Sequence, residues 1–445
     1  DCGPDQLPGR CMNLRDEITE NGIVGAGGAG FPTDVKVDAV PEVLILNAAE
    51  CEPLMHKDEE ILLHQTETVI SGMRRIMAAV GAKKGIVGIK AKHKEIIAKV
   101  KACLSDGISV SEIGDFYPAG DEVTLVYLTT GRVVQPGTLP LTEGCIVQNV
   151  ETVRNIAAAQ PVTEKFLTVA GAVRTPRTLR VPLGMRFRDI LSAFEMTAPR
   201  WAVRVNGLMM GELTRDLDRP VTKTTGGLIV LPEDHHCVQM YERYREPAQT
   251  VRIARAGCDQ CSFCTELCPR YLLGHPVRPE TAMRNRMFSP DGEDPLHAGN
   301  LYCCECNLCT FYACPESLDP RGAAVIEKRK LAQRKTEWKG LSVKPHPLME
   351  YRKVPVRRLM QRLDVLKFTD HAPLQEEGPD CREVRLLLKQ HAGNPALPVV
   401  SSGDMVEKGG KVAEKDGPVS ANIHASVSGR VTAVTKNHID IERRG

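Results

Sequence analysis

The chain has 445 residues, of which 42% are hydrophobic, 26% charged and 4% aromatic. This length is roughly three times that of a typical single domain, so we expect roughly three or four domains. The 58 Lys and Arg residues nearly balance the 56 Asp and Glu residues, and the net charge of +2 argues against a general polyanion binder. No apolar run approaches the roughly 18 residues that span a bilayer, and no leader pattern opens the sequence, so we expect a soluble, unexported protein.

A glycine-rich loop opens the first predicted domain, residues 1–160. Gly25, Gly27 and Gly30 match the dinucleotide-binding pattern G-x-G-x-x-G. That pattern needs a strand before it and a helix directly after it. Here a polar, helix-like stretch precedes the loop, and the following Phe31-Pro32 pair favours extended backbone. We therefore favour a loop whose bare backbone lets a flat ring or a phosphate approach closely.

Buried strands and helices alternate in the remainder of this domain. Val43–Leu46 and Ile86–Ile89 have the apolar pattern of strands, and Ile61–Val80 and His93–Leu104 that of helices, which predicts a mostly parallel sheet. The first strand runs into the polar segment Asn47–Pro53. Because open α/β sheets bind ligands at the carboxyl ends of their strands, Glu50 and Glu52 are candidate site residues. A solvated turn is the alternative interpretation of the two carboxylates.

Residues 161–240 have a different pattern. Phe166–Gly171 and Thr178–Pro182 predict a hairpin, Phe187–Phe194 a short helix and Thr224–Leu231 a last strand. This order resembles the soluble-ligand-binding β-grasp module, abbreviated SLBB. We expect it to be structural.

Nine of the 16 cysteines lie between Cys258 and Cys314, within residues 250–335. They form two motifs, Cys258-x2-Cys261-x2-Cys264-x3-Cys268-Pro269 and Cys303-x2-Cys306-x2-Cys309-x4-Cys314-Pro315. In two-cluster ferredoxins the fourth cysteine of each motif ligates the other cluster. The spacing therefore predicts one 4Fe–4S cluster on Cys258, Cys261, Cys264 and Cys314, and a second on Cys303, Cys306, Cys309 and Cys268. Structural zinc is the alternative, but it uses paired Cys-x2-Cys knuckles. An amphipathic helix, Gly322–Gln333, ends this α-helical domain.

The last part of the chain divides into a linker and an all-β end. Residues 336–380 carry prolines and charges with helical patches and are predicted as a linker. Beyond it, residues 381–445 have strand signals at Val384–Leu388, Pro398–Ser401 and Val431–Ile441. This pattern resembles a barrel-sandwich hybrid of the lipoyl or biotinyl type without its carrier lysine. We therefore expect an exposed docking module.

Four N-terminal motifs, Gly25–Thr33, Asn47–Pro53, Gly120–Glu122 and Asn149–Thr152, resemble in order the FMN and NADH motifs of the flavin-carrying subunit of respiratory complex I. The resemblance implies that the glycines of the loop, together with Phe31 and Lys36, bind the flavin phosphate and the nicotinamide nucleotide. These glycines are Gly25, Gly27, Gly28 and Gly30. The resemblance also implies that Asn47, Glu50 and Glu52 line the flavin ring and the NADH face, and that Gly120, Asp121, Glu122, Asn149 and Thr152 complete the pocket. Ala26, Ala49 and Gln148 depart from the family's arginine, aspartate and asparagine.

The whole arrangement resembles the cobalamin reductases of propanediol-utilisation microcompartments. The resemblance implies an oxidoreductase that passes electrons from NADH through FMN and two 4Fe–4S clusters to a corrinoid, reducing cob(III)alamin or cob(II)alamin toward cob(I)alamin. It also implies an adenosyltransferase and a shell protein as partners, and a cytoplasmic location inside a bacterial microcompartment. No contact with nucleic acid and no direct membrane insertion are expected.

Two alternatives stay open. The related RnfC proteins of membrane-bound Rnf complexes have their barrel-sandwich at the N-terminus, and an Rnf-like electron-input subunit is one alternative. The other is a pure electron relay that never binds NADH, which Ala26 and Ala49 favour because each replaces a charged residue.

Overall fold

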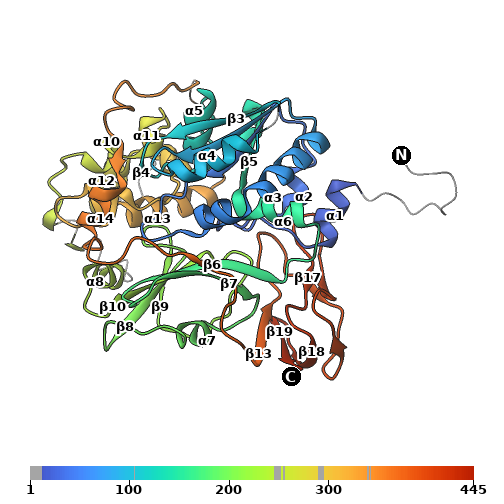
Figure 1. Ribbon diagram of the computed structural model, residues 1–445. Helices are drawn as coiled ribbons and strands as arrows, with labels where there is room; N and C mark the ends of the chain where they lie inside the picture. The colour runs from blue at the N-terminus through green and yellow to red at the C-terminus, as the bar shows by residue number, and fades with distance from the viewer. Residues whose placement is uncertain are drawn as a thin grey trace.

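The computed structural model describes residues 13–104, 106–244, 252–253, 256–288, 295–337, 340 and 342–444. Two layers are visible in Figure 1, with the N-terminal α/β domain and the cysteine-rich domain above the SLBB domain (green) and the C-terminal β module (red). Within the described ranges, no helix combines the length and the apolar character needed to cross a bilayer.

The N-terminal domain is built on a four-stranded parallel sheet in the order β3-β2-β1-β5. Its strands are β1 (Val43–Ala48), β2 (Lys84–Lys90), β3 (Ile108–Ile113) and β5 (Cys145–Asn149). Its helices are α1 (Leu14–Glu20), α2 (Thr33–Lys36), α3 (Lys57–Val80), α4 (Lys94–Ala102), α5 (Glu122–Thr130) and α6 (Val150–Ala158), with a 3-10 turn η1 (Pro140–Glu143). The predicted parallel sheet is confirmed.

Apolar residues on helix α3 explain why it covers the sheet. Val69, Met73 and Ile76 recur at helical spacing and are fully buried, and Gly81 ends the helix in the left-handed conformation. At Gly72 a Cβ atom would lie 2.4 Å from the Val153 carbonyl oxygen on α6. The glycine therefore lets α3 and α6 pack closely beside the site described below.

The SLBB region forms the second sheet, in the order β12-β7-β6-β10-β8-β9. Its strands are β6 (Glu164–Gly171), β7 (Arg177–Pro182), β8 (Trp201–Val205), β9 (Glu212–Thr214), β10 (Gly227–Pro232) and β12 (Leu374–Gln375), and its helices are α7 (Phe187–Leu191) and α8 (His236–Arg243). The predicted hairpin is β6 and β7, which pair antiparallel.

Short helices dominate the cysteine-rich domain. They are α10 (Phe263–Glu266), α11 (Pro269–Leu272), α12 (Pro279–Phe288), the 3-10 helix η2 (Pro295–Tyr302), the π-helical turn η3 (Cys309–Ala313) and α13 (Pro320–Gln333). Helix α13 begins two residues before the predicted Gly322 because Asp319 caps it by accepting the Gly322 N–H at 2.9 Å.

The predicted linker, residues 336–380, is not a free connector in its described part. Strand β11 (Val354–Pro355) pairs antiparallel with β4 (Phe116–Tyr117) of the N-terminal domain. Helix α14 (Val356–Arg362) buries Val356 and Leu359 in the same apolar cluster as Cys306. β12 then adds an edge strand to the SLBB sheet. Charges and prolines suggested a linker. The apolar residues between them, however, pack against the N-terminal, cysteine-rich and SLBB domains, so this segment connects all three.

The C-terminal module consists of two small antiparallel sheets, β13-β19-β18-β15 and β14-β16-β17. The strands are β13 (Glu383–Leu387), β14 (Leu397–Pro398), β15 (Met405–Val406), β16 (Lys411–Glu414), β17 (Ile423–His424), β18 (Gly429–Val434) and β19 (His438–Arg443). The predicted strand Val431–Ile441 is therefore two strands joined by a turn.

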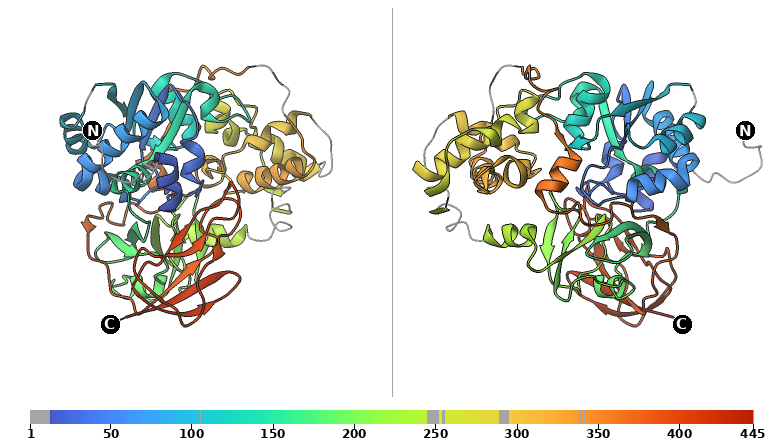
Figure 2. Two further views of the ribbon diagram at one scale, coloured as in Figure 1. Left: turned by 90° about the vertical axis from the view of Figure 1, so that its right-hand side faces the viewer. Right: turned by 60° about the vertical axis from the view of Figure 1, so that its left-hand side comes forward.

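This module is not separated from the redox domains, contrary to the expectation of an exposed docking unit beyond a linker. One apolar cluster runs continuously from Ile18 on α1 to Ile441 on β19. The Ala392 N–H donates to the Gly30 carbonyl at 2.9 Å, and Lys415 pairs with Asp34 at 2.7 Å. Figure 2 shows the module, in red, directly below the N-terminal domain.

Candidate active site and cysteine centres

A cavity of about 550 Å³ lies at the carboxyl edge of the parallel sheet. It falls within the roughly 300–1,000 Å³ typical of ligand sites. Of the residues predicted for the flavin and NADH site, all except Thr152 line it. The lining residues from that prediction are Gly25, Gly27, Gly28, Gly30, Phe31, Lys36, Asn47, Glu50, Glu52, Gly120, Asp121, Glu122 and Asn149.

The glycine loop is closed on itself. The Gly25 N–H donates to the Phe31 carbonyl at 2.9 Å, and Val24 bridges Pro32. Gly28 has a φ of +110°, and a Cβ atom there would meet no protein atom within 4 Å. That position is open to a ligand and accessible to glycine alone without strain. Because α1 precedes the loop where a Rossmann fold has a strand, the dinucleotide fold is ruled out for this loop.

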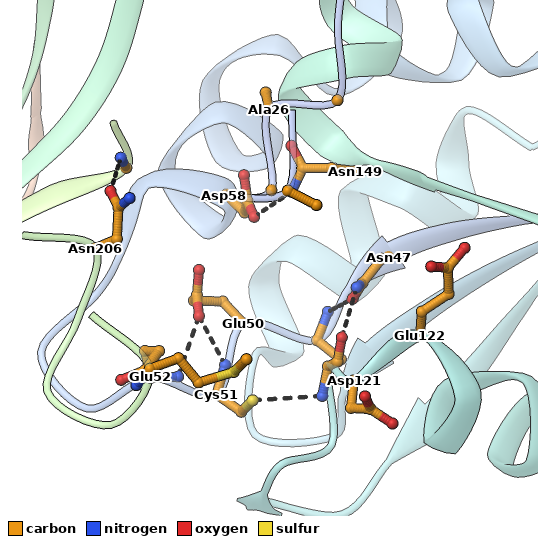
Figure 3. Close-up of a pocket in the computed structure, with 18 of the residues that line it drawn as sticks. Ala26, Asn47, Glu50, Cys51, Glu52, Asp58, Asp121, Glu122, Asn149 and Asn206 are labelled. Atoms are coloured by element: carbon orange, nitrogen blue, oxygen red, sulfur yellow. Dashed lines mark hydrogen bonds between the residues drawn. The ribbon is translucent and has the colours of Figure 1, made fainter. Parts of the chain in front are cut away.

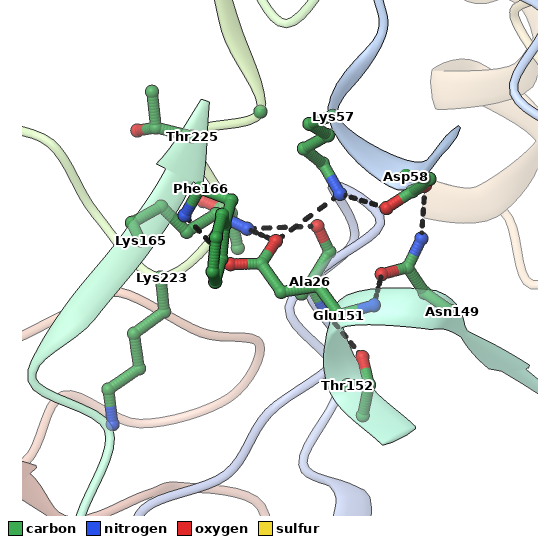
Figure 4. Close-up of polar contacts among 12 residues, drawn as sticks. Ala26, Lys57, Asp58, Asn149, Glu151, Thr152, Lys165, Phe166, Lys223 and Thr225 are labelled. Atoms are coloured by element: carbon green, nitrogen blue, oxygen red, sulfur yellow. Dashed lines mark hydrogen bonds and ion pairs between the residues drawn. The ribbon is translucent and has the colours of Figure 1, made fainter. Parts of the chain in front are cut away.

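Thr152 acts behind the loop. Its Oγ1 accepts the Ala26 N–H at 2.9 Å, while Lys165 Nζ donates to the Ala26 carbonyl at 3.4 Å (Figure 4). Lys165 also pairs with the buried Glu151 carboxylate. Burial lowers the pKa of Lys165 to about 8, although Glu151 opposes the shift. Both backbone polar groups of Ala26 are thus engaged, which fixes the loop from the side away from the cavity.

Lys57 and Asp58 were missed by the sequence analysis and also line the cavity. Lys57 Nζ lies between Asp58 and Glu151, whose charges raise its pKa against the effect of burial. Asn149 Nδ2 donates to Asp58 Oδ2 at 2.7 Å, and Asn149 Oδ1 accepts the Glu151 N–H (Figure 4). The signal was available, because a cation and an anion follow shortly after the Asn47–Pro53 motif and open a long helix.

Glu50 and Glu52 differ in what they contact. Glu50 Oε1 accepts the N–H groups of Cys51 and Glu52 at 2.9 and 3.1 Å, and its other oxygen points away from that turn (Figure 3). Burial, and then the charge of Asp58, raises the pKa of Glu50. Neither carboxylate is the solvated turn residue of the alternative interpretation, since both are half-buried in the cavity wall.

Both oxygens of Glu52 are committed to the SLBB domain. They accept the N–H groups of Met209 and Met210, each at 2.8 Å. Burial raises the pKa of Glu52 to about 7 despite these bonds. Glu52 therefore joins the two domains at the cavity, whereas no described residue donates to the second oxygen of Glu50, which can accept a bond from a ligand.

Asp121 is likewise occupied. It caps α5 by accepting the Thr124 N–H at 2.9 Å. Arg270 on α11 donates two hydrogen bonds to the Asp121 carboxylate, at 2.7 and 2.8 Å. Glu122 pairs with Lys36 at 3.1 Å, and Asn47 Nδ2 donates to the Gly120 carbonyl at 2.9 Å. The predicted site residues are thus brought together, and Asp121 also fastens the cysteine-rich domain to the cavity.

The cavity fits a flavin. Gln148 Nε2 is buried in the lining without a described hydrogen-bond partner. This amide can therefore donate a hydrogen bond to a ring carbonyl or ring nitrogen of a ligand. Gly28 in the same lining offers bare backbone. Glu50, Asn47 and the glycine loop would hold such a group.

The first three cysteines of motif one meet Cys314 and not Cys268. A small cavity of about 30 Å³ is lined by Cys258, Cys261, Cys264 and Cys314, which we call the outer set. Burial, and then Glu280 and the charges of Cys314, Cys261 and Cys258, raises the pKa of Cys264 to about 12. Four converging thiols fit an iron–sulfur cluster, whose irons would take them as thiolates.

Cys268 lies with the second motif. Burial, and then the charges of Cys304 and Cys303, raises the pKa of Cys268. The pKa of Cys309 is raised by burial and then by the charges of Cys303, Cys264 and Cys268. We call Cys268, Cys303, Cys306 and Cys309 the inner set because it borders the flavin cavity. Cys304 and Cys306 line that cavity, and Tyr117 Oη in its wall donates to the Cys306 carbonyl at 2.8 Å.

Comparisons with known proteins agree with this division. Residues 18–158 match the Nuo51 FMN-binding domain, residues 166–194 the SLBB domain, residues 257–319 the 4Fe-4S dicluster domain and residues 364–443 the RnfC barrel sandwich hybrid domain.

Full-length relatives are also found. The chain is 40% identical over 436 residues to cobalamin reductase PduS of Salmonella typhimurium, covering 97% of this chain and 96% of the relative. It is 38% identical over 438 residues to cobalamin reductase PduS of Citrobacter freundii, covering 97% of each. A component of the Na(+)-translocating ferredoxin:NAD(+) oxidoreductase complex of Acetobacterium woodii is 32% identical over 272 residues, which is 58% of each chain. With this likeness along nearly its whole length, and with the FMN-binding, SLBB, 4Fe-4S and barrel-sandwich domains in the expected order, the chain belongs to the family of the cobalamin reductase PduS.

Proposed function

We propose that this protein passes electrons from NADH, through FMN and two 4Fe–4S clusters, to a corrinoid, and takes cob(III)alamin or cob(II)alamin toward cob(I)alamin. The observation that carries the proposal is the shared wall of the flavin cavity and the inner set, where Tyr117, Cys304 and Cys306 line the cavity. A bound flavin would accept a hydride and release its electrons singly, which is what a cluster requires.

We propose a role for individual residues in NADH binding, in flavin binding and in electron transfer to the inner set. Glu50 presents a free carboxylate oxygen on the cavity side, where it can accept a hydrogen bond from a nicotinamide amide or a ribose hydroxyl. The anchored Ala26 fixes the glycine loop, which would contact the ring or phosphate of a bound flavin. Arg270, directly after Cys268-Pro269, holds the inner set against the cavity through Asp121.

The test is anaerobic reconstitution with FMN, iron and sulfide, followed by titration with NADH while flavin and cluster absorbance are recorded together. We expect about eight iron per chain and bleaching of both chromophores. Cys261→Ala should lower iron to about four per chain, while the matched control Cys304→Ala, which removes a thiol outside both sets, should keep about eight. Recovery of zinc, of FAD, or of a flavin that NADH does not bleach would contradict the proposal.

A relay that accepts electrons from a reduced protein and not from NADH is the second candidate. It is favoured by Ala26 at the position of the family's arginine and by the pairing of both lining lysines, Lys36 with Glu122 and Lys57 with Asp58. Reduction of the clusters by a ferredoxin or flavodoxin, with no bleaching by NADH, would select this function. An Rnf-like input subunit would instead exchange electrons with a membrane complex.

We further propose an adenosyltransferase and a microcompartment shell protein as partners, in the cytoplasm inside a bacterial microcompartment. Membership of the PduS family supports this setting. The C-terminal module also leaves Leu397, Val399 and Met405 more than half exposed, which supports docking on this module.

A further inference from the structure

A second large hollow, separate from the flavin cavity, lies beside the outer set. Its volume is about 970 Å³, near the upper end of the roughly 300–1,000 Å³ range of ligand sites. It is lined by Phe263, Glu266, Leu267, Tyr312, Ala313, Tyr351, Arg352, Lys353, Val354, Pro355, Arg358, Gln361 and Arg362. We call it the α14 groove. None of the described residues lines both hollows.

The groove adjoins two ligands of the outer set. Phe263 and Ala313 in its wall directly precede Cys264 and Cys314 in the chain. Arg362 Nη2 donates to the Cys314 carbonyl at 3.2 Å. Helix α14 also packs against η3, whose C-cap residue is Cys314. A molecule in the groove would therefore lie closer to the outer set than anything bound in the flavin cavity.

The groove joins exposed aromatic faces with arginine side chains. Phe263 and Tyr351 are 49% and 82% exposed. Arg358 and Arg362 are exposed, and no described carboxylate forms an ion pair with either. Arg352 and Lys353, by contrast, are paired with Glu266 and Glu350. Aromatic faces stack on flat conjugated rings, and a guanidinium without a carboxylate partner can stack or bind phosphate through two bonds.

We propose that the α14 groove is the binding site of the corrinoid, which receives its electrons there from the outer set. The inference rests on the proposed function. A corrinoid has a broad conjugated ring for the aromatic faces, with amide oxygens and one phosphate for Arg358 and Arg362. It accepts one electron at a time, so two transfers take Co(III) to Co(I) while the protein's clusters are oxidised by the same number of electrons. The axial ligands leave to solvent, and no bond to the protein forms.

The test measures binding separately from turnover. Holoprotein with flavin and clusters is equilibrated with hydroxocobalamin in a dialysis cell, and bound cobalamin is read by absorbance to give Kd. Arg358→Glu and Tyr351→Ala should each raise Kd at least tenfold at unchanged iron and flavin content. The matched control is Arg357→Glu, an exposed arginine on the same helix outside the groove, which should leave Kd and corrinoid reduction unchanged.

The outcomes separate the groove from the function. If the wild-type protein binds and reduces cobalamin but Arg358→Glu and Tyr351→Ala bind it equally well, the groove assignment is wrong and the proposed function stands. If the variants bind free cobalamin normally but fail to reduce it on an adenosyltransferase, the groove docks a protein and the proposal is again overturned. If the wild-type protein neither binds nor reduces cobalamin, both proposals fail.

Discussion

The carboxylates of Glu50 and Glu52 have different hydrogen-bond partners, although the two residues are only two positions apart. Glu52 has both oxygens bonded to Met209 and Met210, whereas Glu50 keeps one oxygen free in the cavity. The carboxylates were predicted as a pair from their position after a strand. The sequence could not separate their roles, because Met209 and Met210 lie on another domain.

We expect Glu50→Gln to lower kcat/KM for NADH by more than about tenfold at unchanged iron content. The amide keeps the shape and the bonds to the Cys51 and Glu52 N–H groups but replaces the free acceptor oxygen with a donor. Stopped-flow flavin bleaching at subsaturating NADH measures this. Glu67→Gln, an exposed carboxylate on α3, is the control, and a surface change costs only ~0.5 kcal/mol. Equal rates for Glu50→Gln and the parent would mean that this carboxylate does not contact the nucleotide.

Lys223 is a buried lysine between three domains. Its Nζ donates to the carbonyls of Gly22 and Asn422, both at 2.6 Å, and burial lowers its pKa to about 7. In the unfolded chain the group titrates near 10.5. Between these values the unfolded state binds the extra proton, so this group makes the folded state more stable as pH rises.

We expect Lys223 to raise the free energy of unfolding by at most about 1.4 kcal/mol per pH unit between pH 7 and 10. Lys223→Met abolishes this increase. Urea unfolding of both proteins at pH 7 and 9.5 measures the difference, which should grow in favour of the wild type. Lys389→Met, on an exposed lysine of the C-terminal module, should follow the wild-type pH dependence. A constant difference between wild type and Lys223→Met would show that Lys223 stays protonated in the fold.

At the scale of elements, α5 and α11 are joined by one ion pair. Asp121 caps α5, and Arg270 is the second residue of α11. Their side chains are 15% and 10% exposed. Sequence motifs identified Asp121 as a pocket residue, but its partner lies 149 positions away and in another motif. No local pattern predicts such a pair.

We expect Arg270→Met to destabilise the fold by about 3–5 kcal/mol, since it leaves the Asp121 carboxylate half-buried without its cation. The double variant Asp121→Leu/Arg270→Met should recover most of that loss, because apolar residues of similar size can replace a buried pair. A double-mutant cycle in urea measures the coupling. Additive single effects would show that the pair contributes nothing to holding α11 against α5.

The cysteine motifs show the opposite case, in which spacing alone predicted which cysteines lie together, while the binding of a cluster by each set stays a prediction. Three cysteines at two-residue gaps wrap one loop, and the proline after each fourth cysteine starts a new segment. The structure accordingly groups Cys314 with the first motif and Cys268 near the second. The α14 groove, by contrast, was not predicted, because its lining residues come from three separate stretches, one of them predicted as a linker, that only folding brings together.

At the scale of the whole molecule, the C-terminal module is part of the redox core. The sequence suggested an independent barrel-sandwich because its strands and turns are self-contained. What it did not reveal is that the module's apolar side chains continue the core of the N-terminal domain and that Ala392 donates to Gly30 in the glycine loop.

We therefore expect deletion of residues 381–445 to abolish flavin retention and NADH-dependent dye reduction, and not to leave them intact. Ala392→Pro is the finer test, since it keeps the module but removes the N–H that Gly30 accepts. It should lower flavin occupancy, measured by chromatography of the released flavin. Val399→Ser, on an exposed residue of the same module, is the control. A truncated protein that retains its flavin would restore the module to a separate docking role.

The contact between the two ends of the chain also sets an order of events during synthesis. Lys411 pairs with Glu20 at a separation of 391 residues, and Asn422 receives a bond from Lys223 beside Gly22. Contacts of such high sequence separation form late, because the intervening chain must first emerge and close the loop. The contacts that hold the glycine loop are therefore completed only after residues up to about Asn422 have left the ribosome. We expect nascent chains that end before this point to lack a finished flavin site, so that flavin is bound only after the cysteine-rich domain has been made.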